Sequence, residues 1–170
     1  LKSTFCIESI ASSLLIAEPW DCGPNGYRLG QFPAGWSEQN DKFRDTVRRF
    51  WRGDNGLIGQ YATRLLGSRD IFTSSYRSIN ASVNFVTYHD GFTLEDLVSY
   101  STKYNDLNGE NNLDGTMENF SSNCGVEGPT DDKEVLARRD LLKRNMMASV
   151  IMGQGIPHIL SGDELCKTQN

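Results

Sequence analysis

Three short apolar runs in this chain end on acidic residues, and helix-like segments separate them. The runs are residues 14–17, 83–88 and 156–160, and the acids that follow are Glu18, Asp90, and the pair Asp163 and Glu164. Apolar residues recur at helical spacing over 56–68, 93–101 and 131–155. Strands that alternate with helices predict an α/β fold with a parallel sheet. Active sites of such folds lie at the carboxyl ends of the strands, so these acids are site candidates; alternatively, each only caps the following helix.

Three further segments complete the predicted pattern. Residues 22–35 are rich in glycine and proline and are predicted to form a loop. Residues 104–130 are rich in asparagine and glycine and predict a longer loop, of the kind that is either functional or disordered. The period of residues 41–51 is ambiguous, and we predict a strand there, followed by a turn at Gly53 and Asp54.

The composition excludes several classes of protein. A chain of 170 residues is long enough for one domain with a core, and its net charge of −5 does not indicate nucleic-acid binding. No apolar run approaches the roughly 20 residues of a membrane helix. With only two histidines and four scattered cysteines, a zinc site is not indicated. We expect the thiols to be free and mostly structural, with a disulfide or redox role as the alternative; they are Cys6, Cys22, Cys124 and Cys166.

Two of the strand-end acids suit glycoside hydrolysis, which needs two carboxyl groups across the scissile bond. One donates a proton to the leaving oxygen, and an apolar surrounding keeps such a group protonated near neutral pH. Glu18 follows an apolar strand and lies beside Trp20, as that role requires, and Asp90 could lie on a neighbouring strand end. Aromatic residues near these acids either stack on sugar rings or belong to the core; they are Trp20, Tyr27, Trp36 and Phe92.

Six segments between residues 14 and 168 resemble one family in colinear order. They are "LIAEPWD", "RLGQFP", "DKFRDTVRRFW", "VNFVTYHDGFTLEDLVSY", "NGENNLDGTMENFSSNCGVEG" and "GIPHILSGDEL". Together they resemble the isoamylase and glycogen-debranching branch of the α-amylase superfamily. The resemblance implies that residues 14–170 are the C-terminal half of a catalytic (β/α)8 TIM barrel, from strand five to strand eight. Residues 1–13 do not match the family and are treated as a separate segment.

The resemblance also implies roles for individual residues. Glu18 matches the general acid/base, Asp90 the aspartate that stabilises the transition state, and His89 a histidine that binds the sugar. We place Trp20 and Tyr27 with His89 as substrate-binding residues. The implied activity is retaining hydrolysis of α-1,6-glucosidic branch linkages in glycogen, amylopectin or limit dextrins, without a cofactor or metal. The resemblance implies an α-glucan as the partner, rather than nucleic acid or membrane. Residues 1–13 carry no readable targeting signal, and the compartments that the resemblance implies are a bacterial cytoplasm or a plastid.

The sequence also agrees with other interpretations. The family's nucleophile is an aspartate upstream of Glu18, and residues 1–17 contain neither aspartate nor arginine. The chain by itself is therefore expected to be inactive, as a truncated product or fragment of a longer enzyme. It could instead be a non-catalytic isoamylase-like subunit that binds glucan or regulates a partner. A metal hydrolase using His89, Asp90 and Asp163 is a third reading, without a ligand motif such as HExxH. We interpret His158 as a packing residue.

Overall fold

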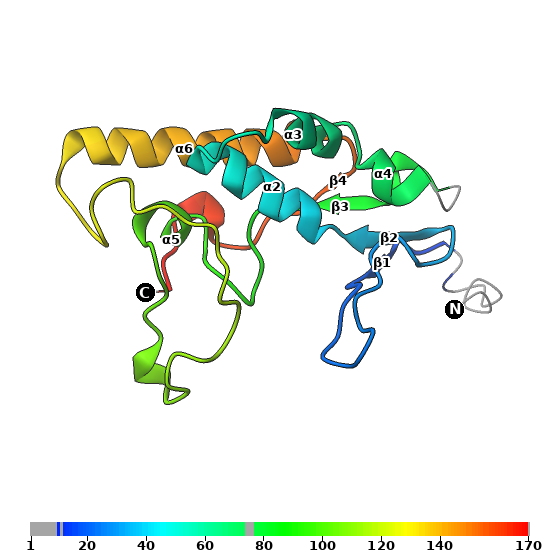
Figure 1. The fold of residues 1–170 in the computed structure, drawn as a ribbon, viewed down its shortest axis with the longest axis horizontal. Helices are drawn as coiled ribbons and strands as arrows, with labels where there is room; N and C mark the ends of the chain where they lie inside the picture. The colour runs from blue at the N-terminus through cyan, green and yellow to red at the C-terminus, as the bar shows by residue number, and fades with distance from the viewer. Residues whose placement is uncertain (1–9, 11, 74–76, 170) are drawn as a thin grey trace.

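A four-stranded parallel sheet organises the computed structural model, which describes residues 10, 12–73 and 77–169. The strands are β1 (Leu15–Ala17), β2 (Trp36–Gln39), β3 (Ser82–Asn84) and β4 (Ile156–Pro157), and they lie side by side in chain order (Figure 1). In the register, Ile16 pairs with Ser37, Glu38 with Ser82, and Val83 with Ile156. The prediction of an α/β fold with a parallel sheet is confirmed.

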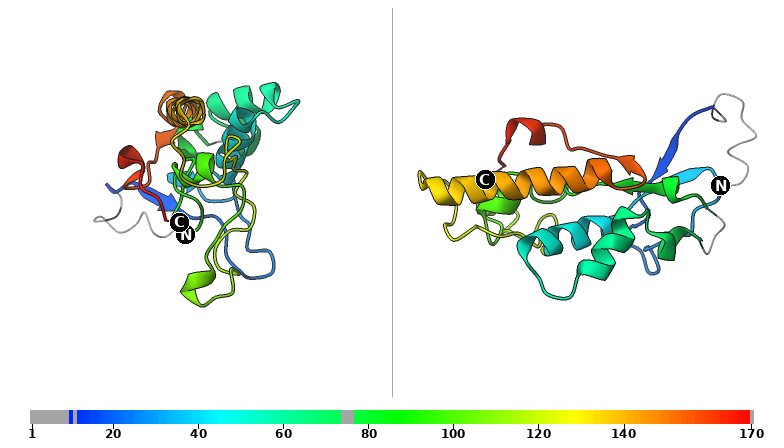
Figure 2. Two further views of the ribbon diagram at one scale, coloured as in Figure 1. Left: turned by 90° about the vertical axis from the view of Figure 1, so that its left-hand side faces the viewer. Right: turned by 90° about the horizontal axis from the view of Figure 1, so that it is seen from above.

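Helices cover one side of this sheet, and two long loops extend from the other side (Figures 1 and 2). In Figure 1, α2, α3 and α6 lie above the strands, and α2 contacts both α3 and α6. The α-helices are α2 (Asp41–Arg52), α3 (Ile58–Leu65), α4 (Arg69–Phe72), α5 (Asp96–Ser99) and α6 (Lys133–Met152). The described residues also include the 3-10 turns η3 (Ile79–Ala81), η4 (Asp106–Asn108) and η5 (Asp163–Leu165).

The strand predicted over residues 41–51 is wrong, because this segment forms α2. The Asn40 side chain caps the helix by accepting a hydrogen bond of 3.0 Å from the Phe43 amide, and Gly53 ends it in the left-handed conformation. Phe43, Thr46 and Val47 are buried and follow helical spacing, so one face of α2 enters the core.

The strands are also shorter than predicted, and one was missed. Leu14 and Ile16 are 63% and 44% exposed although they belong to an apolar run, because β1 forms an edge of the sheet. β3 spans three residues, although the chain remains buried through Thr87, and β4 spans two. β2, with the sequence WSEQ, lacks an apolar run and was not predicted as a strand.

The helices predicted over 56–68 and 131–155 are confirmed as α3 and α6, and the helix predicted over 93–101 is reduced to α5. The segment 104–130 is a loop, as predicted, with η4 as a short turn inside it. Asparagine side chains order this loop: Asn112 accepts a hydrogen bond of 3.0 Å from the Asn105 amide and donates one of 3.0 Å to the Lys103 carbonyl. Of the two readings of this loop, functional or disordered, its internal hydrogen bonds favour the functional one.

The hydrophobic core lies between α2, α5, α6 and the segment that follows β3. Its central side chains are Phe43, Val47, Val86, Phe92, Leu94, Leu97, Val98, Met146 and Val150. Because Val86 and Phe92 flank His89 and Asp90, the core supports the turn that carries two of the predicted site residues.

Among the described residues, none of the helices has the length and apolar character needed to cross a membrane. Three cysteines are free thiols, as expected, but only Cys124 is buried; Cys22 and Cys166 are exposed and therefore not core residues. Cys6 and most of the segment 1–13 lie outside the described residues.

Replacing Asp132 with alanine is expected to lower the free energy of unfolding by about 1 kcal/mol. The Asp132 carboxylate caps α6 by accepting hydrogen bonds of 2.9 Å from the Glu134 amide and 3.3 Å from the Val135 amide. Urea titration followed by circular dichroism measures the change. The neighbouring exposed Asp131 is the matched control, and its replacement with alanine is expected to cost less than about 0.5 kcal/mol. Equal losses from the two variants would rule out the cap.

Candidate functional site

The carboxyl ends of the strands bring together residues that are distant in the sequence. Glu18 directly follows β1, while Tyr88, His89 and Asp90 follow the buried extension of β3. The Tyr88 hydroxyl donates a hydrogen bond of 3.3 Å to Oε2 of Glu18. Tyr88 therefore joins the two strand ends whose acids the sequence singled out.

Tyr88 is electrostatically coupled to both candidate acids. Burial raises the pKa of its phenol, and the negative charges of Glu18 and Asp90 raise the pKa further. A tyrosine held neutral in this way remains a hydrogen-bond donor to the Glu18 carboxylate. Tyr88 was not among the predicted site residues, although its place directly before His89 was an available signal.

Aromatic rings surround Tyr88 at this end of the sheet. Its ring centroid lies 4.4 Å from that of His89, 5.7 Å from that of His158 and 5.3 Å from that of Phe85. His158 also lies against Phe85, which agrees with its interpretation as a packing residue. In addition, Nδ1 of His158 lies 2.9 Å from Nε2 of Gln39, and burial lowers the pKa of the imidazole, which favours a neutral ring that accepts from the amide.

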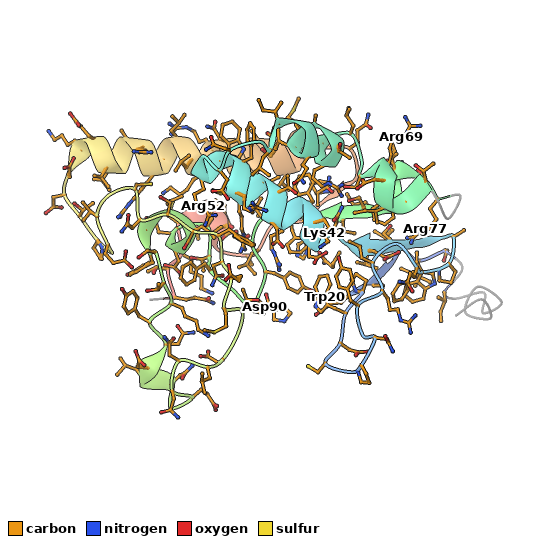
Figure 3. All side chains as sticks on the ribbon, viewed as in Figure 1. Trp20, Lys42, Arg52, Arg69, Arg77 and Asp90 are labelled. Atoms are coloured by element: carbon orange, nitrogen blue, oxygen red, sulfur yellow. The ribbon has the colours of Figure 1, made fainter. Side chains whose placement is uncertain are left out.

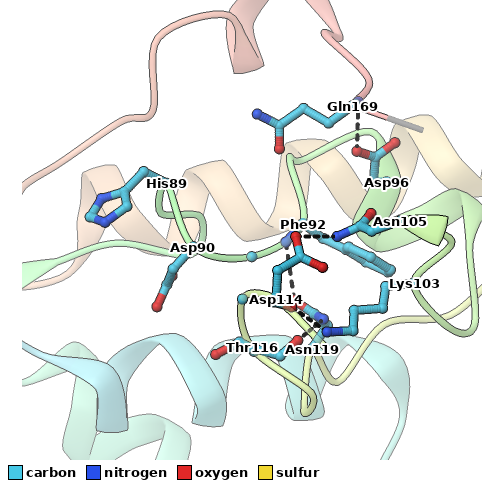
Figure 4. Close-up of a pocket in the computed structure, with 12 residues that line it drawn as sticks. His89, Asp90, Phe92, Asp96, Lys103, Asn105, Asp114, Thr116, Asn119 and Gln169 are labelled. Atoms are coloured by element: carbon cyan, nitrogen blue, oxygen red, sulfur yellow. Dashed lines mark hydrogen bonds between the residues drawn. The ribbon is translucent and has the colours of Figure 1, made fainter. Parts of the chain in front are cut away.

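A pocket of about 350 Å³ adjoins this cluster and extends along the 104–130 loop (Figure 4). His89 and Asp90 line one end of it, and Lys103, Asp114 and Asn119 line the other. Figure 4 shows the Asp90 carboxylate pointing away from Lys103 and Asp114. Both hydrogen-bond donors and hydrogen-bond acceptors line the pocket. This combination suits a ligand with many hydroxyl groups.

The polar wall of the pocket is built by short-range bonds within the loop. Lys103 is buried, and its ammonium group donates to the backbone carbonyl of Asp114. Oδ2 of Asp114 accepts hydrogen bonds of 3.1 Å from Asn105 and 2.9 Å from Asn108. These contacts hold the polar groups in place without a ligand, so the wall is preformed.

The two predicted aromatic contacts lie in different surroundings. Trp20 is half-buried, and Figure 3 shows it on the same side of the molecule as Asp90, between the two long loops. Tyr27 is 46% exposed, and its hydroxyl donates a hydrogen bond of 2.8 Å to Asp41, the first residue of α2. This hydrogen bond makes Tyr27 a link between the 22–35 loop and α2.

The apolar surrounding expected for Glu18 is not present among the described residues, because Glu18 is exposed. The reason is its position at the end of β1, an edge strand with exposed Leu14 and Ile16. Of the other predicted acids, Asp163 is buried and accepts hydrogen bonds from Thr87 and the Leu94 amide, while Glu164 is exposed and accepts one from Gly162.

In the described ranges no group of three His, Cys, Asp or Glu side chains could hold a metal ion. The interpretation as a metal hydrolase used Asp163 beside His89 and Asp90. Because the Asp163 carboxylate is committed to Thr87 and Leu94, the structure gives that reading no support.

Comparison with known proteins identifies the relatives of this chain. It is 56% identical over 155 residues to a glycogen operon protein GlgX homolog of Mycobacterium tuberculosis, covering 91% of this chain and 22% of the relative. It is 50% identical over 150 residues to a glycogen debranching enzyme of Serratia proteamaculans, covering 88% of this chain and 23% of the relative. This chain is homologous to the glycogen debranching enzymes and isoamylases.

A plant protein is also similar to this chain. The chain is 50% identical over 157 residues to isoamylase 3, chloroplastic, of rice, covering 91% of this chain and 20% of the relative. No protein-family model matches. The resemblance to the debranching and isoamylase family, predicted from six motifs, is therefore confirmed, and the chain spans about a fifth of the length of these relatives.

Proposed function

We propose that this chain is part of a glycosidase that hydrolyses α-1,6-glucosidic branch linkages of glycogen, amylopectin or their limit dextrins. The observation that carries the proposal is the meeting of Glu18 with the Tyr88–His89–Asp90 segment at the carboxyl ends of parallel strands. It occurs in a chain whose relatives are named for glycogen debranching and for isoamylase.

The sheet supports the second half of a (β/α)8 barrel. All four strands are parallel and follow one another in chain order, as successive strands of a barrel do. In such a barrel the catalytic residues lie at the carboxyl ends of the strands, where Glu18, His89 and Asp90 lie. β1 and β4 are the outer strands of the sheet and would pair with the remaining barrel strands of the whole protein.

In this proposal each site residue has one role in a retaining mechanism. Glu18 protonates the leaving glycosidic oxygen and then deprotonates the water that releases the sugar, so the proton returns to Glu18. Asp90 and His89 bind the sugar at the cleaved bond, and Asp90 stabilises the positive charge of the transition state. Trp20 and Tyr27 supply aromatic surfaces for sugar rings, and the bond from the Tyr27 hydroxyl to Asp41 holds the 22–35 loop against α2.

Covalent retaining catalysis also needs a carboxylate nucleophile. We place it on a strand outside residues 1–170, so the segment alone is expected to be inactive and the full-length protein active. No organic cofactor enters these steps. The proposed partner is a branched α-glucan, and the proposed compartment is a bacterial cytoplasm or a plastid, where glycogen or starch is made.

The test is the activity of the full-length protein on amylopectin, glycogen and pullulan, measured as new reducing ends. A debranching enzyme releases linear chains, and NMR of the first product would show the α-anomer if configuration is retained. The alternative, a non-catalytic glucan-binding or regulatory subunit, predicts binding to amylopectin without new reducing ends. That result would overturn the proposed activity.

Replacing Asp90 with asparagine in the full-length protein is expected to lower kcat by more than tenfold, which is about 1.4 kcal/mol of transition-state stabilisation. The amide keeps the size of the side chain and removes its negative charge. Steady-state kinetics on amylopectin measures the loss, and Asp106→Asn, an exposed aspartate of η4, is the control. A loss smaller than tenfold would refute the transition-state role of Asp90.

A further inference from the structure

A buried arginine is bonded to the segments that carry the candidate site, and no carboxylate of the described residues is bonded to it. Arg48, on α2, is 1% exposed. Its Nε donates a hydrogen bond of 2.6 Å to the Val86 carbonyl, and Nη1 donates one of 3.0 Å to the Asn119 carbonyl. Burying a guanidinium is costly unless its donors are paired, so loss of either hydrogen bond would be costly. The two bonds therefore hold the Val86 and Asn119 carbonyls in place.

The Asn119 side chain connects this segment to the turn that carries Asp90. Its Oδ1 accepts a hydrogen bond of 3.0 Å from the Phe92 amide, and its Nδ2 donates one of 3.1 Å to the Thr116 carbonyl. The Thr116 amide in turn donates a hydrogen bond of 2.8 Å to the Asp90 carbonyl. The backbone of Asp90 is therefore bonded to a loop segment that Arg48 anchors.

Asp163 holds the same turn from the side of β4. It is 3% exposed, and its Oδ1 accepts a hydrogen bond of 2.9 Å from the Leu94 amide, while Oδ2 accepts one from the Thr87 hydroxyl. Thr87 and Leu94 flank the turn, one on each side. Burial lowers the pKa of Arg48 while the negative charges of Asp90 and Asp163 oppose that change, so both carboxylates lie within electrostatic reach of the guanidinium.

The fit between the turn and the loop leaves no room for side chains at two glycines. A Cβ on Gly91 would lie 2.9 Å from Oδ1 of Asn119, and a Cβ on Gly115, where φ is +62°, would lie 2.7 Å from the Asp90 carbonyl oxygen. The contact is thus a close backbone approach rather than a loose loop packing.

We propose that Arg48, Asn119 and Asp163 form a clamp that positions the His89–Asp90 turn for catalysis. The proposal rests on the proposed function, because positioning matters only if Asp90 acts on a substrate. None of the three bonds the Asp90 carboxylate; they act on the backbone around it. Misplacing a reacting group by about 1 Å can cost on the order of a hundredfold in rate, so the clamp has a kinetic consequence beyond stability.

Arg139 provides a matched control from the same chain. It is a buried arginine on α6, 2% exposed, and its hydrogen bonds within the described part of the chain likewise go to backbone carbonyls, those of Asn123, Val126 and Gly128. These carbonyls belong to residues 123–128, in the last part of the 104–130 loop before α6. Loss of Arg139 therefore reproduces the general cost of losing a buried arginine without loosening Asp90.

The kinetic experiment compares Arg48→Met with Arg139→Met in the full-length protein on amylopectin. Arg48→Met is expected to lower kcat by at least tenfold with a small change in KM, and Arg139→Met by less than twofold per folded molecule. Thr87→Val, which removes one hydroxyl at nearly constant volume, is the milder variant if Arg48→Met does not fold. Its expected loss in kcat is threefold or more.

Non-additivity separates positioning from a structural role. If the clamp acts through Asp90, Arg48→Met and Thr87→Val should each lower kcat by less than twofold when Asp90 is already asparagine. Full additivity with Asp90→Asn would overturn the proposal. So would an Arg48→Met enzyme whose kcat stays within twofold of the wild type.

Hydrogen exchange provides a readout that does not depend on activity. Arg48→Met and Thr87→Val should speed amide exchange in peptides covering residues 86–94 by at least tenfold, and Arg139→Met should not. A wild-type protein that fails to debranch glucan refutes the proposed function, while unchanged exchange over 86–94 refutes the clamp.

Discussion

Replacing Glu18 with glutamine in the full-length protein is expected to lower kcat for branch hydrolysis by about 10²–10⁴-fold. The amide has the same shape and can still accept the hydrogen bond from Tyr88, but it can neither donate nor recover the catalytic proton. Steady-state release of reducing ends from amylopectin measures the loss. A maltosyl fluoride, whose leaving group needs no protonation, should lose much less rate in its first step.

The matched control is Glu164→Gln, because Glu164 is also an exposed glutamate that follows a strand of the same sheet. Its carboxylate accepts a hydrogen bond of 2.9 Å from the Gly162 amide and lies in the 3-10 turn η5. We expect its kcat to stay within about twofold of the wild type. Full activity of Glu18→Gln, or equal losses on amylopectin and on the fluoride, would show that Glu18 is not the acid/base.

The second large effect concerns a buried ion pair that holds β2. Glu38 and Arg77 have side chains that are 0% and 1% exposed and are bonded to each other. Glu38 also accepts hydrogen bonds of 2.6 Å from the Gly30 amide and 3.3 Å from the Phe32 amide. Replacing Arg77 with methionine is therefore expected to destabilise the protein by about 3–5 kcal/mol, because it leaves a buried carboxylate without its cation.

Urea unfolding followed by tryptophan fluorescence measures this loss. Arg64→Met is the matched control: the Arg64 side chain is 7% exposed, but its partner Asp70 is 53% exposed and remains solvated when the arginine is removed. The control should lose less than about 1.5 kcal/mol. The double variant Glu38→Leu with Arg77→Met should recover much of the stability, and an equally unstable double variant would mean that the charge pair is not the cause.

The segment 41–51 shows how local pattern can mislead and be corrected. Phe43, Thr46, Val47 and Phe50 fit a helix once Asn40 is recognised as its N-cap and Gly53 as its C-cap. The caps were visible in the sequence, so this error was avoidable. The polar strand WSEQ could not be predicted from its local pattern. The partner that makes its buried glutamate tolerable is Arg77, which lies 39 residues away in the chain.

The sequence by itself determined the family, the parallel α/β class, the helices α3 and α6, and the order of the acids at the strand ends. These depend on local periodicity and on motifs that lie within single segments. Only the tertiary structure decided that Tyr88 meets Glu18, that β1 is an exposed edge, and that Arg48 and Asp163 hold the Asp90 turn. Each of these depends on contacts between distant segments, in which burial and hydrogen-bond partners are set by packing rather than by neighbours in the chain.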